Sequence, residues 1–272
     1  MARAAVVVMH LRKNIGKIEI MSATGPVSQT RLHASEMPHR QRMLEMFKQR
    51  PISDEELLVN TGLFLRSGAL AKILFLDEIY KKIISIPGCI CEFGVWWGQS
   101  LALFENLRAV YEPYNHTRLI VGFDTFEGYK AVGEHDKRSA TISEGVYGLS
   151  DNYFDYLDEL LSLHEQENVM SHVKKHLVVK GDVTETVPQF FLDHPEQLVS
   201  LAYFDLALYE PTKIALSTIA SRMVSGSVVA FDELNNASYP GETVAALEVL
   251  NLREWSVARS RVLPDRTIFT KL

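Results

Sequence analysis

Short apolar runs alternate with longer amphipathic stretches over the last two thirds of the chain. This alternation is typical of successive strand–helix units and predicts a mostly parallel sheet with helices packed on it. The apolar runs predict strands at residues 89–95, 119–124, 176–180, 199–206 and 227–232. The amphipathic stretches predict helices at residues 100–111, 152–167, 184–192, 211–223 and 241–252. A turn at Pro264 and Asp265 predicts a final antiparallel hairpin of residues 256–261 and 267–270.

A helical pattern precedes the first strand. Between residues 36 and 86, apolar side chains recur at three- and four-residue spacing, and SDEE at residues 53–56 is typical of a helix start. We therefore predict a helical cap at residues 36–87. Residues 1–35 mix basic, polar and turn-forming types with little periodicity, which predicts a flexible N-terminal arm. Met21 inside this arm is an alternative start of the chain.

Composition narrows the class of protein. With 47% hydrophobic and 23% charged residues, the chain is typical of a globular protein, and its net charge of −6 gives no general attraction for a phosphate backbone. We therefore expect no nucleic-acid substrate. No secretion signal or apolar run long enough to span a membrane is present. Cys89 and Cys91 alternate within a predicted strand and read as buried, reduced thiols, so we expect a cytoplasmic protein.

The residues just past each predicted strand carry the candidate chemistry, because open α/β sheets bind ligands at the carboxyl ends of their strands. The first strand runs into EFGVWWGQS at residues 92–100. Gly94 and Gly98 let the backbone approach a ligand closely, and the helix that begins near Ser100 points N–H groups toward it. The loop suits a carboxylate or a phosphate. It is neither GxGxxG nor a phosphate-binding P-loop, so an ordinary strand–helix turn explains it equally well.

Acidic residues follow the next two strands. Asp124 closes the second strand about thirty residues after the glycine loop, where nucleotide-binding sheets place an acceptor for ribose hydroxyls. Asp182 follows the third strand and has two interpretations. It accepts a hydrogen bond from the exocyclic amine of adenine, or it caps the helix that begins near Thr184, and capping is favoured for this motif alone.

Three further acids, Asp205, Asp232 and Glu233, follow the fourth and fifth strands. If these strands are neighbours, the three carboxylates converge, and oxygen ligands with open positions are what Mg²⁺ accepts. Buried carboxylates repel one another unless something neutralises them. In the competing interpretation, Asp232 caps a turn and Glu233 faces solvent.

Taken together, the motifs resemble those of the macrocin, mycinamicin and novobiocin type of sugar O-methyltransferases, over residues 60–272. The matching pieces are EFGVWWGQS at 92–100, GFDTFEG at 122–128, KGDVTET at 180–186, FDLALYEPT at 204–212, FDE at 231–233 and PGET at 240–243. Several motifs in one order are far more specific than any one of them.

This resemblance implies an α/β class I methyltransferase fold for residues 88–272, with a Rossmann-like, doubly wound sheet. It implies S-adenosyl-L-methionine as cofactor, bound by Glu92, Gly94, Val95, Trp96, Ser100, Asp124, Thr125, Phe126, Gly181, Asp182, Val183 and Asp205. It also implies Mg²⁺ held by Asp205, Asp232 and Glu233, orienting a sugar's vicinal hydroxyls. The acceptor would be a small molecule: a sugar on a natural product, or one linked to a nucleotide or polysaccharide. Enzymes of this kind are commonly symmetric homo-oligomers, which we expect here.

One departure from the family concerns catalysis. Many relatives carry a second acid two residues after the one that matches Asp205, within reach of the acceptor hydroxyl as a general base, whereas this chain has Ala207. Asp205 remains as a catalytic acid, and the candidates for a replacement base are Tyr209, His135 and Glu210. Because methyl transfer depends heavily on positioning, activity can survive this change. Two alternatives stay open: a metal-independent transferase to nitrogen, carbon or phosphate-linked oxygen, and a non-catalytic relative.

The segment at residues 129–153 carries Gly133, Gly145 and Gly148 among charged and aromatic residues. A connection of this length in a compact domain is more often functional than a plain surface loop. We predict that it is a mobile lid over the acceptor site that sets specificity.

Overall fold

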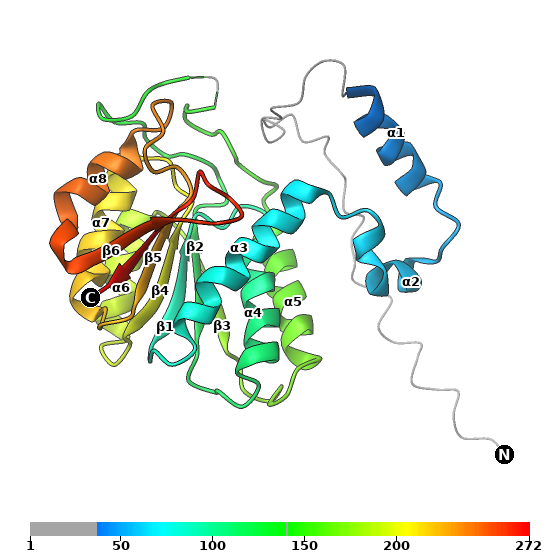
Figure 1. The fold of residues 1–272 in the computed structure, drawn as a ribbon, viewed down its shortest axis with the longest axis horizontal. Helices are drawn as coiled ribbons and strands as arrows, with labels where there is room; N and C mark the ends of the chain where they lie inside the picture. Colours follow the sequence, from blue (N-terminus) through cyan, green and yellow to red (C-terminus); the bar gives the residue numbers. More distant parts are fainter. Residues whose placement is uncertain (1–36, 140) are drawn as a thin grey trace.

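The structure, a computed structural model, describes residues 37–139 and 141–272 (Figure 1). The arm predicted at residues 1–35 lies outside the described residues. A seven-stranded sheet has the order β3-β2-β1-β4-β5-β7-β6. Its strands are β1 (Cys89–Phe93), β2 (Ile120–Asp124), β3 (His176–Lys180), β4 (Val199–Phe204), β5 (Val228–Phe231), β6 (Trp255–Arg259) and β7 (Thr267–Lys271). The first five are parallel, and β7 and β6 add to β5 as an antiparallel hairpin.

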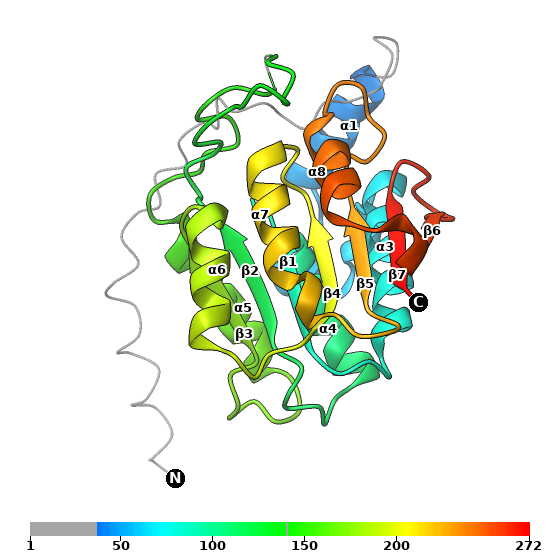
Figure 2. The same ribbon diagram turned by 90° about the vertical axis from the view of Figure 1, so that its left-hand side faces the viewer.

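Helices cover both faces of this sheet (Figure 2). One face carries α3 (Ser67–Ile83), α4 (Gln99–Tyr111) and α5 (Tyr153–Gln166), and the other carries α6 (Val183–Asp193), α7 (Tyr209–Ile219) and α8 (Gly241–Val249). Short 3₁₀ turns lie at Thr61–Leu63, Ala220–Arg222 and Leu252–Glu254. Each face has its own buried core because the five parallel strands alternate their apolar side chains between the two faces. The doubly wound sheet predicted from the sequence is therefore confirmed.

A row of four phenylalanines crosses the sheet at or next to the last residue of four neighbouring strands. Phe93 stacks on Phe123 with ring centroids 5.4 Å apart and on Phe204 at 4.5 Å, and Phe204 stacks on Phe231 at 5.1 Å. These residues are direct partners in the strand register. Consequently the residue after each phenylalanine, whether Gly94, Asp124, Asp205 or Asp232, emerges at the same edge of the sheet.

The predicted helical cap consists of parts that differ in burial. In α3, five side chains are buried in the core, namely Phe75, Leu76, Ile79, Tyr80 and Ile83. By contrast α1 (Met37–Lys48) and α2 (Asp54–Val59) stand away from the body, and α2 buries no residue (Figure 1). Ser53 caps α2 through its hydroxyl, as SDEE predicts. Helix α3 therefore belongs to the body of the domain, whereas α1 and α2 project from it.

The predicted elements match the observed ones, with ends that differ by up to four residues. Among residues 37–139 and 141–272, no helix combines the length and apolar character needed to cross a membrane. Cys89 and Cys91 are free and buried, as expected from their alternation in β1.

Candidate active site

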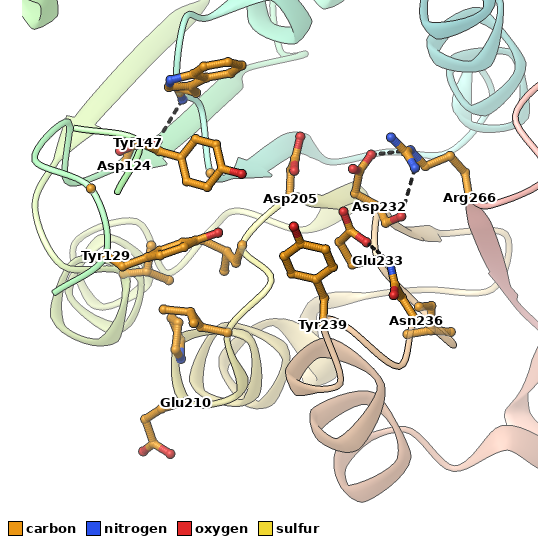
Figure 3. A pocket seen from close by; sticks show the side chains of 18 of the residues that line it. Asp124, Tyr129, Tyr147, Asp205, Glu210, Asp232, Glu233, Asn236, Tyr239 and Arg266 are labelled. Carbon is orange, nitrogen blue, oxygen red and sulfur yellow. Dashed lines mark hydrogen bonds and ion pairs between the residues drawn. The ribbon is translucent and has the colours of Figure 1, made fainter. Parts of the chain in front are cut away.

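A cleft of about 1180 Å³ opens at the carboxyl ends of the parallel strands. Its walls come from the loops after β1, β2, β3, β4 and β5 and from the turn between β6 and β7. Nine of the residues predicted to bind cofactor or metal line it: Gly94, Trp96, Asp124, Thr125, Asp182, Val183, Asp205, Asp232 and Glu233. The phenylalanine row thus places Gly94, Asp124, Asp205 and Asp232 at one cleft, part of which is shown in Figure 3.

Asp124 fastens the glycine loop. Its Oδ2 accepts hydrogen bonds from the backbone N–H of Val95 at 2.7 Å and of Trp96 at 2.8 Å, and its Oδ1 accepts from Phe126 N–H at 2.7 Å. Trp96 and Phe126 both have left-handed backbone angles, φ 49° and 57°. The acid predicted to receive ribose hydroxyls is therefore also the residue that shapes the loops after β1 and β2.

Gly94 is required by a close contact between two strand ends. Its φ is 89°, and a Cβ there would lie 2.1 Å from the carbonyl oxygen of Asp205. A larger residue would push the loop after β1 away from the loop after β4. Gly98, at φ 74°, opens α4 against Leu157, where a Cβ would come within 2.3 Å of that side chain.

Glu92, at the end of β1, is only 1% exposed, and its Oε2 has no hydrogen-bond partner among the described residues. Burial raises the pKa of Glu92 to about 8, against the opposing influence of Lys72 and of Ser100. Glu92 and Ser100 lie behind the wall of the cleft rather than on it. A buried carboxylate oxygen without a hydrogen-bond partner is costly, so a cationic donor from a ligand would stabilise it.

Asp182 caps α6, as its favoured interpretation predicts. Its Oδ1 accepts hydrogen bonds from the N–H of Thr184 at 2.9 Å and from the hydroxyl of Thr184 at 2.7 Å. The same residue lines the cleft. Gly181 lies beside it in a small side pocket with Lys180 and Glu185. Capping and ligand binding are therefore compatible at Asp182.

Asp205, Asp232 and Glu233, here called the acidic cluster, all line the cleft (Figure 3). The hydroxyl of Tyr203 donates a 2.8 Å hydrogen bond to Oδ1 of Asp232, and the Nε of Arg266 forms an ion pair with the same oxygen. No hydrogen bond from a described residue to Oδ2 of Asp232 accompanies these two contacts. Burial and the neighbouring Asp205 raise the pKa of Asp232 to about 7, although Arg266 opposes this shift.

Glu233 completes the acidic cluster. The side-chain amide of Asn236 donates a 2.6 Å hydrogen bond to Oε2 of Glu233, and burial raises the pKa of Glu233. The oxygens of the three acids do not all lie within 4.8 Å of one another. Among the described residues, only the ligand atoms of Glu105, Glu165 and His176 form a group that close. The side chains of the acidic cluster would therefore have to draw closer to surround an ion.

Glu242, in the first turn of α8, ties the loops of the acidic cluster together. Its Oε1 accepts hydrogen bonds from the N–H of Leu206 at 2.9 Å and of Ala207 at 3.0 Å, and its Oε2 accepts from Glu233 N–H at 3.0 Å. Glu242 is fully buried, and burial raises its pKa to about 8. One carboxylate thus fixes the backbone beside Asp205 and beside Glu233.

Tyrosines form the opposite wall. Tyr129 and Tyr147 come from the segment at residues 129–153, and their rings meet edge to face at 5.5 Å. Tyr239 comes from the loop after β5, and its hydroxyl exchanges a 2.9 Å hydrogen bond with that of Thr141. In Figure 3 the hydroxyls of Tyr147 and Tyr239 point toward Asp205. The predicted lid segment therefore supplies part of the cleft wall.

The lid segment is also anchored by polar and apolar contacts. Asp136 Oδ2 accepts a hydrogen bond from Gly133 N–H at 2.9 Å, and its Oδ1 accepts from Tyr209 N–H at 2.8 Å, at the start of α7. Val132, Ile142 and Leu208 form a small separate core beside this bond.

Two predicted catalytic residues, His135 and Tyr209, are placed outside the cleft lining. The hydroxyl of Tyr209 donates to Glu248 at 2.7 Å and accepts from Lys213 at 2.7 Å, both on the outer side of α7 and α8. His135 stacks on the Tyr209 ring at 4.3 Å and is 43% exposed. Glu210 does line the cleft, but its carboxylate points away from Asp205 in Figure 3. Geometry therefore gives no support to these residues as bases.

Other contributors to the site escaped the sequence prediction: Lys72, Tyr203, Glu242 and Arg266. Lys72 comes from α3, and its ammonium lies 3.8 Å from Oδ2 of Asp205. Glu242 was visible within the PGET motif, which gave no indication of its hydrogen bonds. Lys72 and Arg266 belong to an amphipathic helix and to a hairpin turn, where a basic residue ordinarily signals only a solvated face.

Comparison with known proteins supplies the remaining observations. No family model and no curated protein matches the chain. A solved structure of CalS11, a calicheamicin methyltransferase, is 38% identical, covers 91% of this chain and 98% of its own, and has a TM-score of 0.85. An apo structure of CalS11, described as a TDP-rhamnose 3′-O-methyltransferase, is also 38% identical, covers 89% of this chain and 96% of its own, and has a TM-score of 0.77.

A more distant structure agrees in fold. The O-methyltransferase NovP is 17% identical, covers 74% of this chain and 79% of its own, and has a TM-score of 0.58. The fold of this chain is therefore shared with solved methyltransferases.

Proposed function

Because the chain belongs to the family of S-adenosylmethionine-dependent sugar O-methyltransferases that its motifs resemble, we propose that it methylates a sugar hydroxyl within this cleft. It has the class I methyltransferase fold. The observation that carries the proposal is the convergence of the glycine loop and the acidic cluster on one cleft. A methyl donor and a polar acceptor can lie side by side there.

The cofactor supplies a methyl group on a positively charged sulfur. The residues that would hold it are the glycine loop with Glu92 and Ser100, Asp124 at the end of β2, and the loop that begins at Gly181. The N–H groups of Val95, Trp96 and Phe126 are already bound to Asp124, so this part of the site is pre-organised. The tyrosines of the opposite wall would exclude water from the acceptor.

A divalent cation fits the acidic cluster by its chemistry. Three carboxylates line the same part of the cleft, and burial raises the pKa values of Asp232 and Glu233. A bound Mg²⁺ would supply charge for orienting vicinal hydroxyls and making them more acidic. Of the predicted catalytic residues, Asp205 and Glu210 line the cleft, and the carboxylate of Glu210 points away from Asp205. We therefore propose that Asp205 receives or directs the acceptor's proton.

A metal-independent reaction is a second candidate, favoured by one observation. Arg266 already pairs with Asp232, and Lys72 with Asp205, so two side chains bring positive charge to the acidic cluster. In such a reaction, positioning by the cleft would carry catalysis without a metal.

The acceptor that we propose is a nucleotide-linked sugar. This rests on the relative described as a TDP-rhamnose methyltransferase and on the size of the cleft, which extends from Gly94 to Arg259 and Arg266. Aromatic walls suit the apolar faces of a sugar, and Arg259, which lines the cleft, suits a diphosphate. We propose no nucleic-acid substrate.

We also propose a homo-oligomer in the cytoplasm. Large apolar side chains are exposed on the projecting helices and on α3: Met43, Leu44, Met46, Phe47, Leu58, Val59, Leu63, Leu70 and Leu74. A second copy of the chain would cover such a surface. The reduced state of Cys89 and Cys91 supports the location.

Calorimetric titration with S-adenosylhomocysteine, with Mg²⁺ and again with a chelator, tests the proposal. We expect S-adenosylhomocysteine to bind in both buffers. In a methyl-transfer assay under the same two conditions, we expect turnover of a nucleotide-linked 6-deoxysugar with Mg²⁺ and none with the chelator. Equal turnover after exhaustive chelation would favour the metal-independent reaction. Absence of binding in both buffers would contradict the proposed function itself and favour a non-catalytic relative.

A further inference from the structure

Lys72 lines the cleft and acts on acids of both the glycine loop and the acidic cluster. It projects from α3 into the cleft, with its side chain 27% exposed, and its ammonium lies 3.8 Å from Oδ2 of Asp205 and 5.9 Å from the centre of the Tyr203 ring. Burial raises the pKa values of Glu92 and Asp232, and the positive charge of Lys72 opposes this rise at both acids. One ammonium group therefore acts on acids from three neighbouring strands.

Glu92 lacks a hydrogen-bond donor for one of its carboxylate oxygens. Its Oε2 is buried and has no hydrogen-bond partner among the described residues, and Lys72 acts on it electrostatically, without a hydrogen bond to that oxygen. An α-amino acid group offers an ammonium for a buried carboxylate and a carboxylate for an ammonium. Lys72, which lines the cleft, is complementary to the carboxylate of such a group, and Glu92, which lies behind the cleft wall, is complementary to its ammonium. The amino-acid end of S-adenosylmethionine is a group of this kind.

Asp205 is the anionic partner of Lys72 in this structure. Its Oδ2 faces Lys72, and the oxygens of the acidic cluster do not all approach within 4.8 Å. A divalent cation and the ammonium of Lys72 would repel each other if both lay against the carboxylate of Asp205. A metal therefore binds more readily when Lys72 has a different anionic partner.

We propose that Lys72 binds the α-carboxylate of the cofactor and that this contact releases Asp205 to the metal, so that cofactor and metal bind cooperatively. The inference rests on the proposed function. Coupling of this kind is reciprocal: each ligand raises the affinity of the other by the same factor. Lys72 is thus a binding residue for the cofactor and a positioning residue for the acidic cluster.

The experiment measures binding rather than turnover. Mg²⁺ is titrated calorimetrically into the full-length protein with and without saturating S-adenosylhomocysteine, and the titrations are repeated with 5′-methylthioadenosine, which lacks the amino-acid end. For the unmodified protein we expect S-adenosylhomocysteine to raise Mg²⁺ affinity by about tenfold and methylthioadenosine to leave it unchanged.

Two variants separate this role from a structural one. Lys72→Met should weaken S-adenosylhomocysteine by about tenfold or more, leave methylthioadenosine unaffected, and bind Mg²⁺ more tightly than the unmodified protein does without cofactor. Lys72→Arg keeps the charge and should retain most of the coupling. Thermal melts of both variants check that the fold is intact.

The outcomes are distinguishable. If the unmodified protein does not bind S-adenosylhomocysteine, the proposed function fails. If it binds, but Lys72→Met binds S-adenosylhomocysteine and Mg²⁺ as the unmodified protein does, only the role of Lys72 is wrong. Equal weakening of S-adenosylhomocysteine and methylthioadenosine would show general damage to the site and would also overturn the proposal.

Discussion

The phenol of Tyr203 and the carboxylate of Asp232 form a buried hydrogen bond of 2.8 Å between neighbouring strand ends. Because Arg266 pairs with the same oxygen, the carboxylate is held with its other oxygen available. Tyr203→Phe should therefore lower Mg²⁺ affinity by about tenfold and destabilise the fold by about 1 to 3 kcal/mol. Metal titration and denaturant unfolding measure the two effects.

Tyr80→Phe is the matched control for this substitution. Tyr80 is also fully buried, and its hydroxyl donates a 2.7 Å hydrogen bond to Glu112, which lies outside the cleft lining. It should lose stability to a similar extent and keep its Mg²⁺ affinity. If both variants lowered metal affinity alike, the effect of Tyr203 would be general loosening rather than orientation of Asp232.

Glu242→Gln should impair turnover more than its distance from the acceptor suggests. Glu242 accepts three backbone N–H bonds, and a glutamine would turn a donor toward at least one of those N–H groups. We expect a loss of about 1 to 3 kcal/mol in unfolding free energy and about a tenfold fall in kcat, because Asp205 and Glu233 lose their common support. Glu248→Gln, on the exposed side of the same helix, should leave kcat unchanged. Full activity of Glu242→Gln would show that the loops hold themselves.

Asp136→Asn tests the anchor of the lid segment. In the unmodified protein both carboxylate oxygens of Asp136 accept backbone N–H bonds, from Gly133 and Tyr209. The substitution replaces one of these oxygens by an amide NH₂, which cannot accept such a bond. We expect KM for the acceptor to rise by about threefold to tenfold while the Kd of S-adenosylhomocysteine stays the same. Steady-state kinetics and calorimetry give the two quantities. Glu134→Gln, which changes an exposed neighbour, serves as the control, and a matching rise in its KM would contradict the assignment to Asp136.

Ala207→Asp restores the acid that many relatives carry. Ala207 is buried with φ 60°, a left-handed angle that aspartate adopts more easily than alanine does. If the protein methylates a sugar diol, the substitution should preserve or raise kcat. Ala207→Asn has the same shape and backbone tolerance without the charge, so a gain confined to aspartate would indicate proton transfer. A clear loss of turnover in Ala207→Asp alone would favour the metal-independent reaction.

Glu165 predicts how stability depends on pH. It is buried between Arg108 and Lys175, at 2.5 Å and 2.6 Å, and although burial alone would raise its pKa, these two cations lower it below the ordinary 4.5. The stabilisation should therefore be complete above about pH 5 and be lost as pH falls through the lowered pKa of the folded state. Glu165→Gln should cost about 3 to 5 kcal/mol at pH 7 and less at pH 3. Urea unfolding at both values checks this, and an equal cost at both would be the contrary result.

The sequence predicted the sheet well because its information is local. Each parallel strand is a short apolar run followed at once by a polar or glycine residue, as in Phe204 and Asp205. The predicted helix ends were off by up to four residues, and one of these differences depends on a contact between distant residues. Helix α7 begins at Tyr209 rather than at 211, since Asp136, far away in the sequence, satisfies the first N–H.

The site was predicted less completely because several contacts join distant residues. Asp124 and the acidic cluster stand directly after strands, and their position alone identifies them. Lys72 and Arg266 reach the cleft only through the packing of α3 and of the β6–β7 hairpin, which no local pattern specifies. His135 and Tyr209 were chosen for their chemistry, and packing turns both toward the outer side of α7.

The row of phenylalanines has a consequence for how this enzyme can diverge. Four stacked rings bind neighbouring strands into a rigid platform, and the polar residues stand one position beyond it. The buried rings stabilise the sheet, whereas the loops that follow the strand ends determine selectivity. A loop can therefore be exchanged without disturbing the hydrophobic layer. Changes in the loops that cover the cleft can then create a site for a new acceptor, while the strand ends that would bind the methyl donor stay unchanged.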